Sequence, residues 1–323
     1  MDSKRIHLSP KLEFLISIAG IYTSYIYFGI LQEHIYTNPN RKPFKHPEFV
    51  VLCQMFLGTI VSYISILYIV SKIFNEKQKS TLPTKLAVYY GVAFSYSMFL
   101  TNFSLTLVSY PTQALAKSCK ILPTLLGSIF VKDVHYHPLQ YLSVFMITTG
   151  VIIFNWKGQG FGNDSILGLT MLLGSLSLDS LTSYYAEHIR RNTNLTSLQI
   201  MNYCCKWGFI AIFPIVLLID LFSEETILSY LINYPGIMID IISFGFASAI
   251  GQIFIFWALK ISGSLTLSII TTIRKFLTVL MSILWFSHKL NEMQWICMAL
   301  VFSGTLLDML VSHKIGKPKH KDN

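Results

Sequence analysis

The sequence predicts an all-α, polytopic membrane protein of about ten transmembrane helices. Of its 323 residues, 53% are hydrophobic and only 13% are charged, whereas soluble domains carry roughly a quarter charged residues. So few charges cannot solvate a water-facing surface, and we expect much of the apolar surface to face lipid. The formal charge is +9, but the basic residues are spread over loops, chain ends and apolar stretches, which disfavours nucleic-acid binding.

Ten stretches are long and apolar enough to cross the hydrocarbon core, which takes roughly 20 residues as a helix. Short connections separate them, and most of these contain Pro, Asn, Lys or Gly. No segment resembles a soluble domain, so residues 1–323 are expected to form a single transmembrane domain with a polar tail at 313–323. The predicted helices cover residues 12–36, 48–74, 83–101, 107–131, 138–156, 165–187, 200–222, 237–259, 264–287 and 291–312.

The distribution of Lys and Arg predicts that both termini lie in the cytosol. With the N-terminus placed there, the cytosolic loops and ends hold 15 of the 25 basic residues and the opposite side holds 5. Cytosolic loops are the ones that carry the excess of Lys and Arg. An even number of helices then returns the C-terminus to the cytosol.

An internal repeat links the two halves of the chain. Residues 109–155 match residues 263–309 weakly at a constant offset of 154, so that Lys120 falls on Arg274 and Gly150 on Gly304. The match predicts two halves, residues 12–156 and 165–312, with five helices each. Because five is odd, the halves have opposite orientations, and transporters with such inverted repeats hold their substrate at the repeat interface.

Five basic residues lie inside the predicted spans: Lys117, Lys120, Lys206, Arg274 and Lys275. A charge in mid-bilayer costs roughly 3 kcal/mol on insertion scales and persists where it faces a cavity, a partner or a ligand. Lys117 and Lys120 share one helix face because they are three residues apart. Lys206 lies closer to a membrane end, where its side chain can reach the interface.

The four central cations predict a cavity for a strongly anionic ligand such as phosphate, which Lys binds as a point charge and Arg binds with two parallel hydrogen bonds. The alternative is internal neutralisation, with Glu33 and Asp179 as the plausible partners. Two central carboxylates leave an excess of positive charge, which favours the anion site. A nucleobase or sugar could stack on one of the many tyrosines, but the sequence does not choose among them.

Signatures of enzymes, metal sites and cofactors are missing. His135-x-His137 has no third ligand nearby, so no metal is expected, and no cofactor either. A membrane-embedded transferase would need an acid/base constellation, and none is recognisable. The five cysteines all fall in apolar stretches and are expected to act as small buried hydrophobes: Cys53, Cys119, Cys204, Cys205 and Cys297.

The last residues resemble a sorting signal. Lys321 and Lys319 stand third and fifth from the C-terminus of this sequence, the spacing of the dilysine signal by which coat proteins retrieve proteins to the endoplasmic reticulum. A receptor-read signal of this kind requires the tail to be cytosolic, as the predicted topology has it. The alternative is that these lysines only anchor the last helix electrostatically.

Several motifs resemble one known family over essentially the whole chain. They are Gln113-Ala-Leu-Ala-Lys-Ser-Cys-Lys120, Ser248-Ala-Ile-Gly-Gln-Ile-Phe-Ile-Phe256, Ser268-Ile-Ile-Thr-Thr-Ile-Arg-Lys-Phe276, Gln294-Trp295 and Tyr27-Phe-Gly-Ile-Leu-Gln-Glu-His34. This pattern resembles the B subfamily of nucleotide-sugar transporters, and within it the UDP-galactose transporter homologues of the endoplasmic reticulum. The proline expected directly after the Lys120 motif is Ile121 here, and only Pro123 is kept.

The resemblance implies the drug/metabolite transporter fold and exchange of a cytosolic nucleotide species for a lumenal nucleotide. The substrate would be UDP-galactose or UDP-glucose, with ATP/ADP exchange as the alternative, in the membrane of the endoplasmic reticulum or else of the Golgi. A non-transporting scaffold or receptor is the competing class. The resemblance assigns phosphate contacts to Lys117, Lys120, Arg274 and Lys275, and weaker binding or gating roles to Glu33, Gln113 and Gln252.

Overall fold

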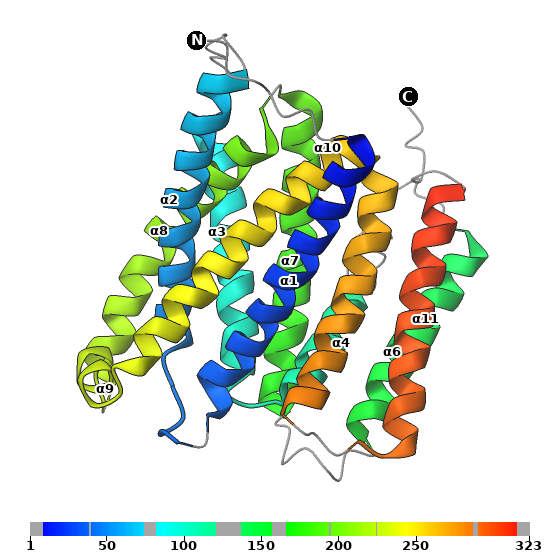
Figure 1. Cartoon of the computed structure of the whole chain (residues 1–323). Helices are drawn as coiled ribbons and strands as arrows, with labels where there is room; N and C mark the ends of the chain where they lie inside the picture. The colour runs from blue at the N-terminus through cyan, green and yellow to red at the C-terminus, as the bar shows by residue number, and fades with distance from the viewer. Residues whose placement is uncertain are drawn as a thin grey trace.

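The computed structural model describes residues 9–38, 40–73, 82–120, 137–156, 166–193, 195–223, 225–286 and 290–314. Every regular element within these ranges is a helix, as the sequence predicts (Figure 1). The elements are α1 (Pro10–Thr37), α2 (Pro47–Ile73), α3 (Thr84–Ser104), α4 (Tyr110–Ala116), η1 (Lys117–Lys120), α6 (Pro138–Trp156), α7 (Ile166–Asn192), α8 (Ser197–Phe222), α9 (Ile227–Asn233), α10 (Gly236–Trp285) and α11 (Glu292–Lys314).

The chain is a multi-pass membrane protein. Among the residues that the structure describes, six helical segments are long and apolar enough to cross a bilayer, and Pro138–Phe154 is a shorter apolar helix. The predicted helix at 107–131 is described only as far as Lys120, so the total of ten stays a prediction. The six segments are Lys11–Thr37, Pro47–Leu67, Ile166–Arg190, Ser197–Phe222, Gly236–Ala258 and Glu292–Val311.

Polar side chains fix where several of these helices begin. Ser9 accepts a hydrogen bond from the Leu12 N–H at the start of α1, and Thr196 forms a reciprocal capping box with Gln199 at the start of α8. Such caps satisfy backbone N–H groups that have no partner in the first helical turn. The observed boundaries therefore lie within a few residues of the predicted ones.

The eighth and ninth predicted helices are two arms of one continuous element, α10, which has 50 residues. Figure 1 shows the yellow arm running to one face of the bundle, reversing there and returning as the orange arm. The sequence predicts a break at 260–263, but helical hydrogen bonding continues around the turn. The first residues of α1 and the last residues of α11 lie at the same face as this turn (Figure 1), so both described ends of the chain are on one side.

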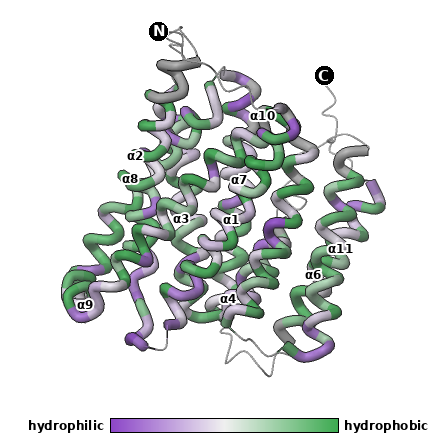
Figure 2. Tube along the Cα trace, viewed as in Figure 1, coloured by the Kyte–Doolittle hydropathy of each residue, from purple (hydrophilic) through white to green (hydrophobic). Residues whose placement is uncertain are grey.

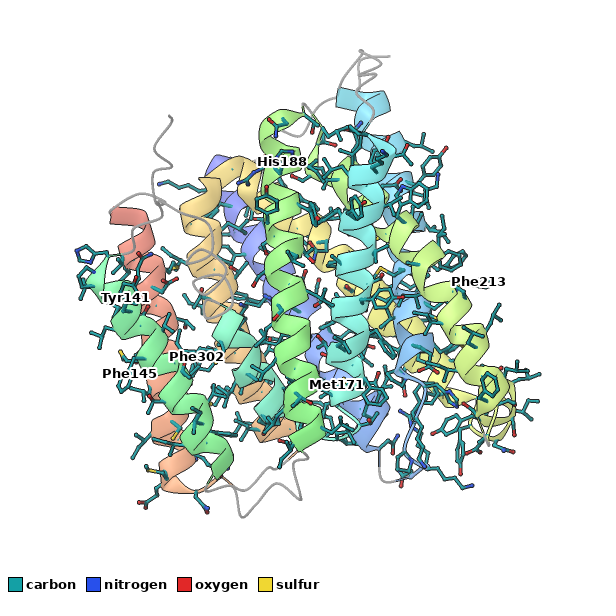
Figure 3. All side chains as sticks on the ribbon, turned by 180° about the vertical axis from the view of Figure 1, so that it is seen from behind. Tyr141, Phe145, Met171, His188, Phe213 and Phe302 are labelled. Atoms are coloured by element: carbon teal, nitrogen blue, oxygen red, sulfur yellow. The ribbon has the colours of Figure 1, made fainter. Side chains whose placement is uncertain are left out.

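Large apolar side chains cover the outside of the bundle. Figure 2 shows helices that are mainly hydrophobic, with hydrophilic residues concentrated at turns and ends and in short stretches inside the bundle. Tyr141 and Phe145 of α6 and Phe213 of α8 point outward in Figure 3, and Phe145 is 67% exposed. An apolar surface of this extent is stable in lipid and would be an aggregation site in water.

Two glycines bring α6 and α11 into close contact at one crossing. A Cβ added to Gly150 would lie 3.1 Å from the carbonyl oxygen of Cys297, and a Cβ added to Gly304 would lie 3.0 Å from that of Ser143. Both distances are shorter than normal carbon–oxygen contacts, so the crossing requires glycine on both helices. The two contacts have the same register, because Gly304 follows Gly150, and Cys297 follows Ser143, by 154 residues.

The same reciprocity recurs elsewhere in the bundle. At the start of α6 the Gln140 Oε1 accepts a hydrogen bond of 3.0 Å from the His137 N–H, and at the start of α11 the Gln294 Oε1 accepts one of 3.0 Å from the Asn291 N–H. Three more glycine pairs are approached by side chains at matching offsets, which are 154 residues or, between α2 and α8, 150 residues. They are Gly20 and Gly174 (approached by Phe254 and Leu100), Gly58 and Gly208 (Cys205 and Met55), and Gly91 and Gly245 (Trp207 and Leu57).

Candidate functional site

The fourth helix changes geometry at its lysine motif. It begins as an α-helix at Tyr110 and continues as a 3₁₀ turn from Lys117 to Lys120. A 3₁₀ helix has three residues per turn, so positions 117 and 120 lie one above the other. The turn contacts α6, α7 and α11 and therefore lies inside the bundle. Pro123, the proline that is kept after the Lys120 motif, lies outside the described residues.

Lys117 forms an ion pair with Asp179 near the middle of α7. The Nζ of Lys117 donates to the Asp179 Oδ2 at 2.7 Å, and the Ser97 hydroxyl of α3 donates to the other carboxylate oxygen. The Lys117 and Asp179 side chains keep 23% and 24% of their surface accessible. The pair is therefore inside the bundle without being sealed. Internal pairing, one of the two alternatives from the sequence, holds for Lys117.

Arg274 lies near the middle of the second arm of α10 and stacks on an aromatic ring. Its guanidinium carbon is 3.9 Å from the ring centroid of Tyr25 in α1, a cation–π geometry. The buried Arg274 Nε makes no hydrogen bond within the described part of the chain. Tyr25 neutralises no charge, so Arg274 keeps both its charge and a donor for an anionic ligand.

A cavity of about 390 Å³ lies between α2, α3, α7, α8 and α10, within the range of small-molecule sites. Tyr90 near the start of α3, Arg190 near the end of α7 and Ser197 at the start of α8 mark its outer end, at the face shared by the described chain ends. Gln54 and Gln252 reach it from the middle of the bundle. Gln252, which the sequence analysis assigned to the site, thus lies on the cavity wall.

Two residues that line the cavity lie close in the chain to contacts of the two cations. Gln252 follows Gly251, where an added Cβ would lie 2.6 Å from the Tyr25 ring, the ring that carries Arg274. Ser183, another lining residue, donates a hydrogen bond of 2.8 Å to the Asp179 carbonyl. Gln252 on the cavity wall is thus one residue from the contact with Tyr25, and Ser183 is one helical turn from Asp179.

Polar contacts close the bundle at the opposite face. The Gln32 Nε2 of α1 donates to the Asn102 Oδ1 of α3 at 2.9 Å, and the buried Gln113 of α4 donates to the Thr101 carbonyl at 3.2 Å. Glu33 is almost completely buried and accepts a hydrogen bond from Ser282 of α10. Glu33 and Gln113 thus connect helices at the closed end, where a gating role fits better than direct contact with a ligand in the cavity.

At the same face, the chain between α1 and α2 is held against α10 and the segment before α9. Arg41 donates to Asp240 at 2.9 Å and caps the last carbonyls of α1. His46 hydrogen-bonds to Glu48 and to the Glu225 carbonyl, both at 2.9 Å. The hydrogen bond with Glu48 raises the pKa of the His46 imidazole.

The remaining predicted residues have different surroundings. The Lys275 side chain is exposed, in contrast to that of its neighbour Arg274, and Lys206 is exposed on α8, as expected for a residue outside the site. Lys120 lies in the 3₁₀ turn, while Lys319 and Lys321 fall outside the described residues. Within the described residues no three metal-ligating side chains come together.

Sequence reasoning gave no site role to three residues: Ser97, Asp179 and Tyr25. Asp179 appeared only as a neutralising partner, and Tyr25 only as one of many tyrosines. The internal repeat contained a signal, because Tyr25 and Asp179 are themselves 154 residues apart, the offset that also relates Lys120 to Arg274.

A helical multi-pass bundle with cations and a cavity in its interior has the architecture of a membrane transporter. The chain matches the UAA transporter family over residues 13–312. It belongs to this family, in the B subfamily of nucleotide-sugar transporters, and is a transporter for nucleotide sugars or nucleotides rather than an enzyme.

Relatives and a solved structure agree with this assignment. The chain is 34% identical to Solute carrier family 35 member B1 of Xenopus laevis over 320 residues, which is 97% of this chain and 98% of the relative. It is 32% identical to the protein of the same name from Gallus gallus, over 98% of both chains. A solved crystal structure that is 14% identical covers 95% of this chain and 99% of its own with a TM-score of 0.57, a likeness in fold alone.

Proposed function

We propose that this protein carries a UDP-sugar, UDP-galactose or UDP-glucose, across the membrane of the endoplasmic reticulum in exchange for a lumenal nucleotide. The observation that carries the proposal is Arg274, a cation in mid-membrane that stacks on Tyr25 and has a buried donor without an acceptor in the described chain. A phosphate group supplies the missing acceptor and the missing negative charge. The names of the relatives, members of a solute carrier family, support transport as the activity.

Alternating access in this proposal is a rocking of two inverted halves, residues 12–156 and 165–312, around the cations. The reciprocal glycine contacts support such a pseudo-two-fold relation, since each contact in one half has a counterpart at a matching offset. With the described chain ends placed in the cytosol, the cavity faces the cytosol. The contacts of Gln32, Gln113 and Arg41 then form the closed lumenal gate.

Counterflow in proteoliposomes tests the proposal. Vesicles containing the purified protein are loaded with UMP, UDP-galactose, UDP-glucose, ADP or ATP, and uptake of labelled UDP-galactose or ATP is measured against a panel of competitors. We expect loading with uridine nucleotides to stimulate UDP-sugar uptake. If only ATP uptake is stimulated, and only by internal ADP, the protein is an ATP/ADP exchanger and the UDP-sugar proposal is wrong. Uptake that no internal nucleotide stimulates would contradict exchange altogether.

We also propose that Lys319 and Lys321 retrieve the protein to the endoplasmic reticulum through cytosolic coat proteins. Changing both residues to Ser is expected to let the protein reach the Golgi, while exchange in proteoliposomes stays at the wild-type rate. Appending a few residues after Asn323 is expected to act in the same way, because the signal is read at a fixed distance from the carboxylate. Imaging that finds the extended protein wholly in the endoplasmic reticulum would show that residence is encoded elsewhere.

A further inference from the structure

We propose that Asp179 is an internal competitor of the substrate, whose carboxylate holds Lys117 while no phosphate does and releases it when a phosphate binds. The inference rests on the proposed function and adds a residue that sets both affinity and coupling. It starts from the Lys117–Asp179 ion pair at 2.7 Å.

The pair has the properties of an exchangeable contact. An ammonium group donates to carboxylate and phosphate oxygens alike, so both anions fit the same donor. The carboxylate and the phosphate cannot both bind Lys117 without a large cost in free energy, because two negative charges in one low-dielectric site repel each other. About a quarter of each side chain remains accessible, and Asp179 lies one turn from Ser183 on the cavity wall. In this proposal a ligand reaches Lys117 through this accessible part of the pair, one helical turn from the cavity wall.

Asp179 also has a place to which it can withdraw. The Ser97 hydroxyl has one proton to donate, and it lies within hydrogen-bond distance of two acceptors, the second Asp179 carboxylate oxygen and the Ser175 carbonyl oxygen at 3.0 Å. When Lys117 turns to a phosphate, the carboxylate keeps the Ser97 hydroxyl as a partner. The exchange of partners is thus a local rearrangement that breaks one ion pair and forms another.

The second cation, Arg274, contacts the residue of the other half that corresponds to Asp179, although in the repeat Arg274 itself matches Lys120 and not Lys117. Tyr25 and Asp179 are related by the repeat offset of 154 residues, as Gly20 and Gly174 are. The Arg274 guanidinium stacks on the ring of Tyr25. A tyrosine face binds a guanidinium without neutralising it, whereas a carboxylate neutralises an ammonium. The site is therefore asymmetric: Arg274 stays charged for phosphate, and Lys117 is the switched cation.

Two opposite effects on transport follow. A substrate must first displace Asp179 from Lys117. The apparent affinity of the protein for the substrate is therefore the intrinsic affinity multiplied by the fraction of protein molecules in which Lys117 is available. Asp179 also neutralises Lys117 when the empty protein changes between its cytosol-facing and lumen-facing states. Without this partner the change would place an unpaired cation inside the membrane, which is energetically unfavourable. Asp179 thus weakens substrate binding and permits net transport that is not strictly coupled to exchange.

The test measures substrate affinity and the ratio of net uptake to exchange in Asp179→Asn. Net uptake is measured into vesicles without nucleotide, and exchange into vesicles loaded with it. We expect the KM for the nucleotide substrate to fall about tenfold, since the competing charged hydrogen bond is gone, and the ratio of net uptake to exchange to fall by a similar factor. Asp179→Glu is expected to restore the wild-type ratio, and Glu292→Gln, at an exposed carboxylate of α11, to leave both quantities unchanged.

Two further measurements keep the outcome decisive. Ser97→Ala removes the hydrogen bond to the second carboxylate oxygen of Asp179, and the carboxylate then binds Lys117 more strongly. We therefore expect the KM of Ser97→Ala to rise, whereas that of Asp179→Asn falls. If Asp179→Asn does not fold, the KM of Ser97→Ala decides the test. Binding of tripolyphosphate to the purified protein, followed by thermal stabilisation, reports on Lys117 without transport. Tighter binding by Asp179→Asn than by wild type is expected even if no nucleotide is exchanged, in which case the proposed function alone has failed. Weaker or equal binding by folded Asp179→Asn, with an unchanged uptake ratio, would overturn the inference.

Discussion

Arg274→Ala is expected to lower nucleotide exchange about 100-fold or more while the protein still inserts and folds. An arginine fork donates two parallel hydrogen bonds to phosphate, and each charged hydrogen bond contributes about 1.5–3 kcal/mol. Losing two of them costs at least about 3 kcal/mol, or roughly two powers of ten in substrate binding. The substitution also removes the cation that stacks on Tyr25, so the loss includes the positive charge of the site.

Exchange rates in proteoliposomes with matched protein content measure this effect. Arg274→Lys keeps the charge without the fork and is expected to give an intermediate rate. Lys206→Ala removes a cation from an exposed position of α8 and serves as the control with wild-type exchange. Lys120→Ala is expected to abolish exchange as Arg274→Ala does, since it stands at the matching position of the repeat. Normal exchange by folded Arg274→Ala would remove the basis of the proposed site.

Alanine at Gly150 or Gly304 is expected to destabilise the folded protein by about 1–3 kcal/mol, the usual cost of overpacking. Each added Cβ meets a backbone carbonyl oxygen, at 3.1 Å and 3.0 Å, and a backbone atom cannot swing away as a side chain does. The two glycines lie at one α6–α11 crossing, so a single separation of these helices relieves both clashes. The double substitution is therefore expected to cost less than the sum of the single ones.

Thermal unfolding of the purified variants, followed by the fraction that stays monodisperse, measures these costs. Gly236→Ala is the matched control, because an added Cβ there meets nothing within 4 Å. We expect it to unfold at the wild-type temperature. Strictly additive costs at Gly150 and Gly304 would mean that the two clashes are relieved separately and that the reciprocal crossing is not one mechanical unit.

The fold was largely predictable from the sequence because the bilayer constrains it strongly. A span needs a fixed length of apolar helix, so α1, α2, α6, α8 and α11 begin and end within a few residues of their predicted bounds. The continuous α10 was not predicted, since a short polar link reads as a break although helical hydrogen bonds can pass through it. The short helix α9 went unnoticed because seven residues give no span signal.

The cations of the site were also visible in the sequence, since a charge in an apolar stretch is costly and marks a cavity, a partner or a ligand. Which of these applies to each cation was decided only by the tertiary structure. Lys117 pairs with a carboxylate 62 positions along the chain, and Arg274 stacks on a tyrosine of the first helix. Local patterns cannot distinguish the two cases, because an ion pair depends on how separate helices pack and not on the residues beside each charge. By itself the sequence thus showed which charges stand inside apolar stretches, and helix packing determined that Lys117 pairs with a carboxylate, that Arg274 stacks on Tyr25 and that Lys275 is exposed.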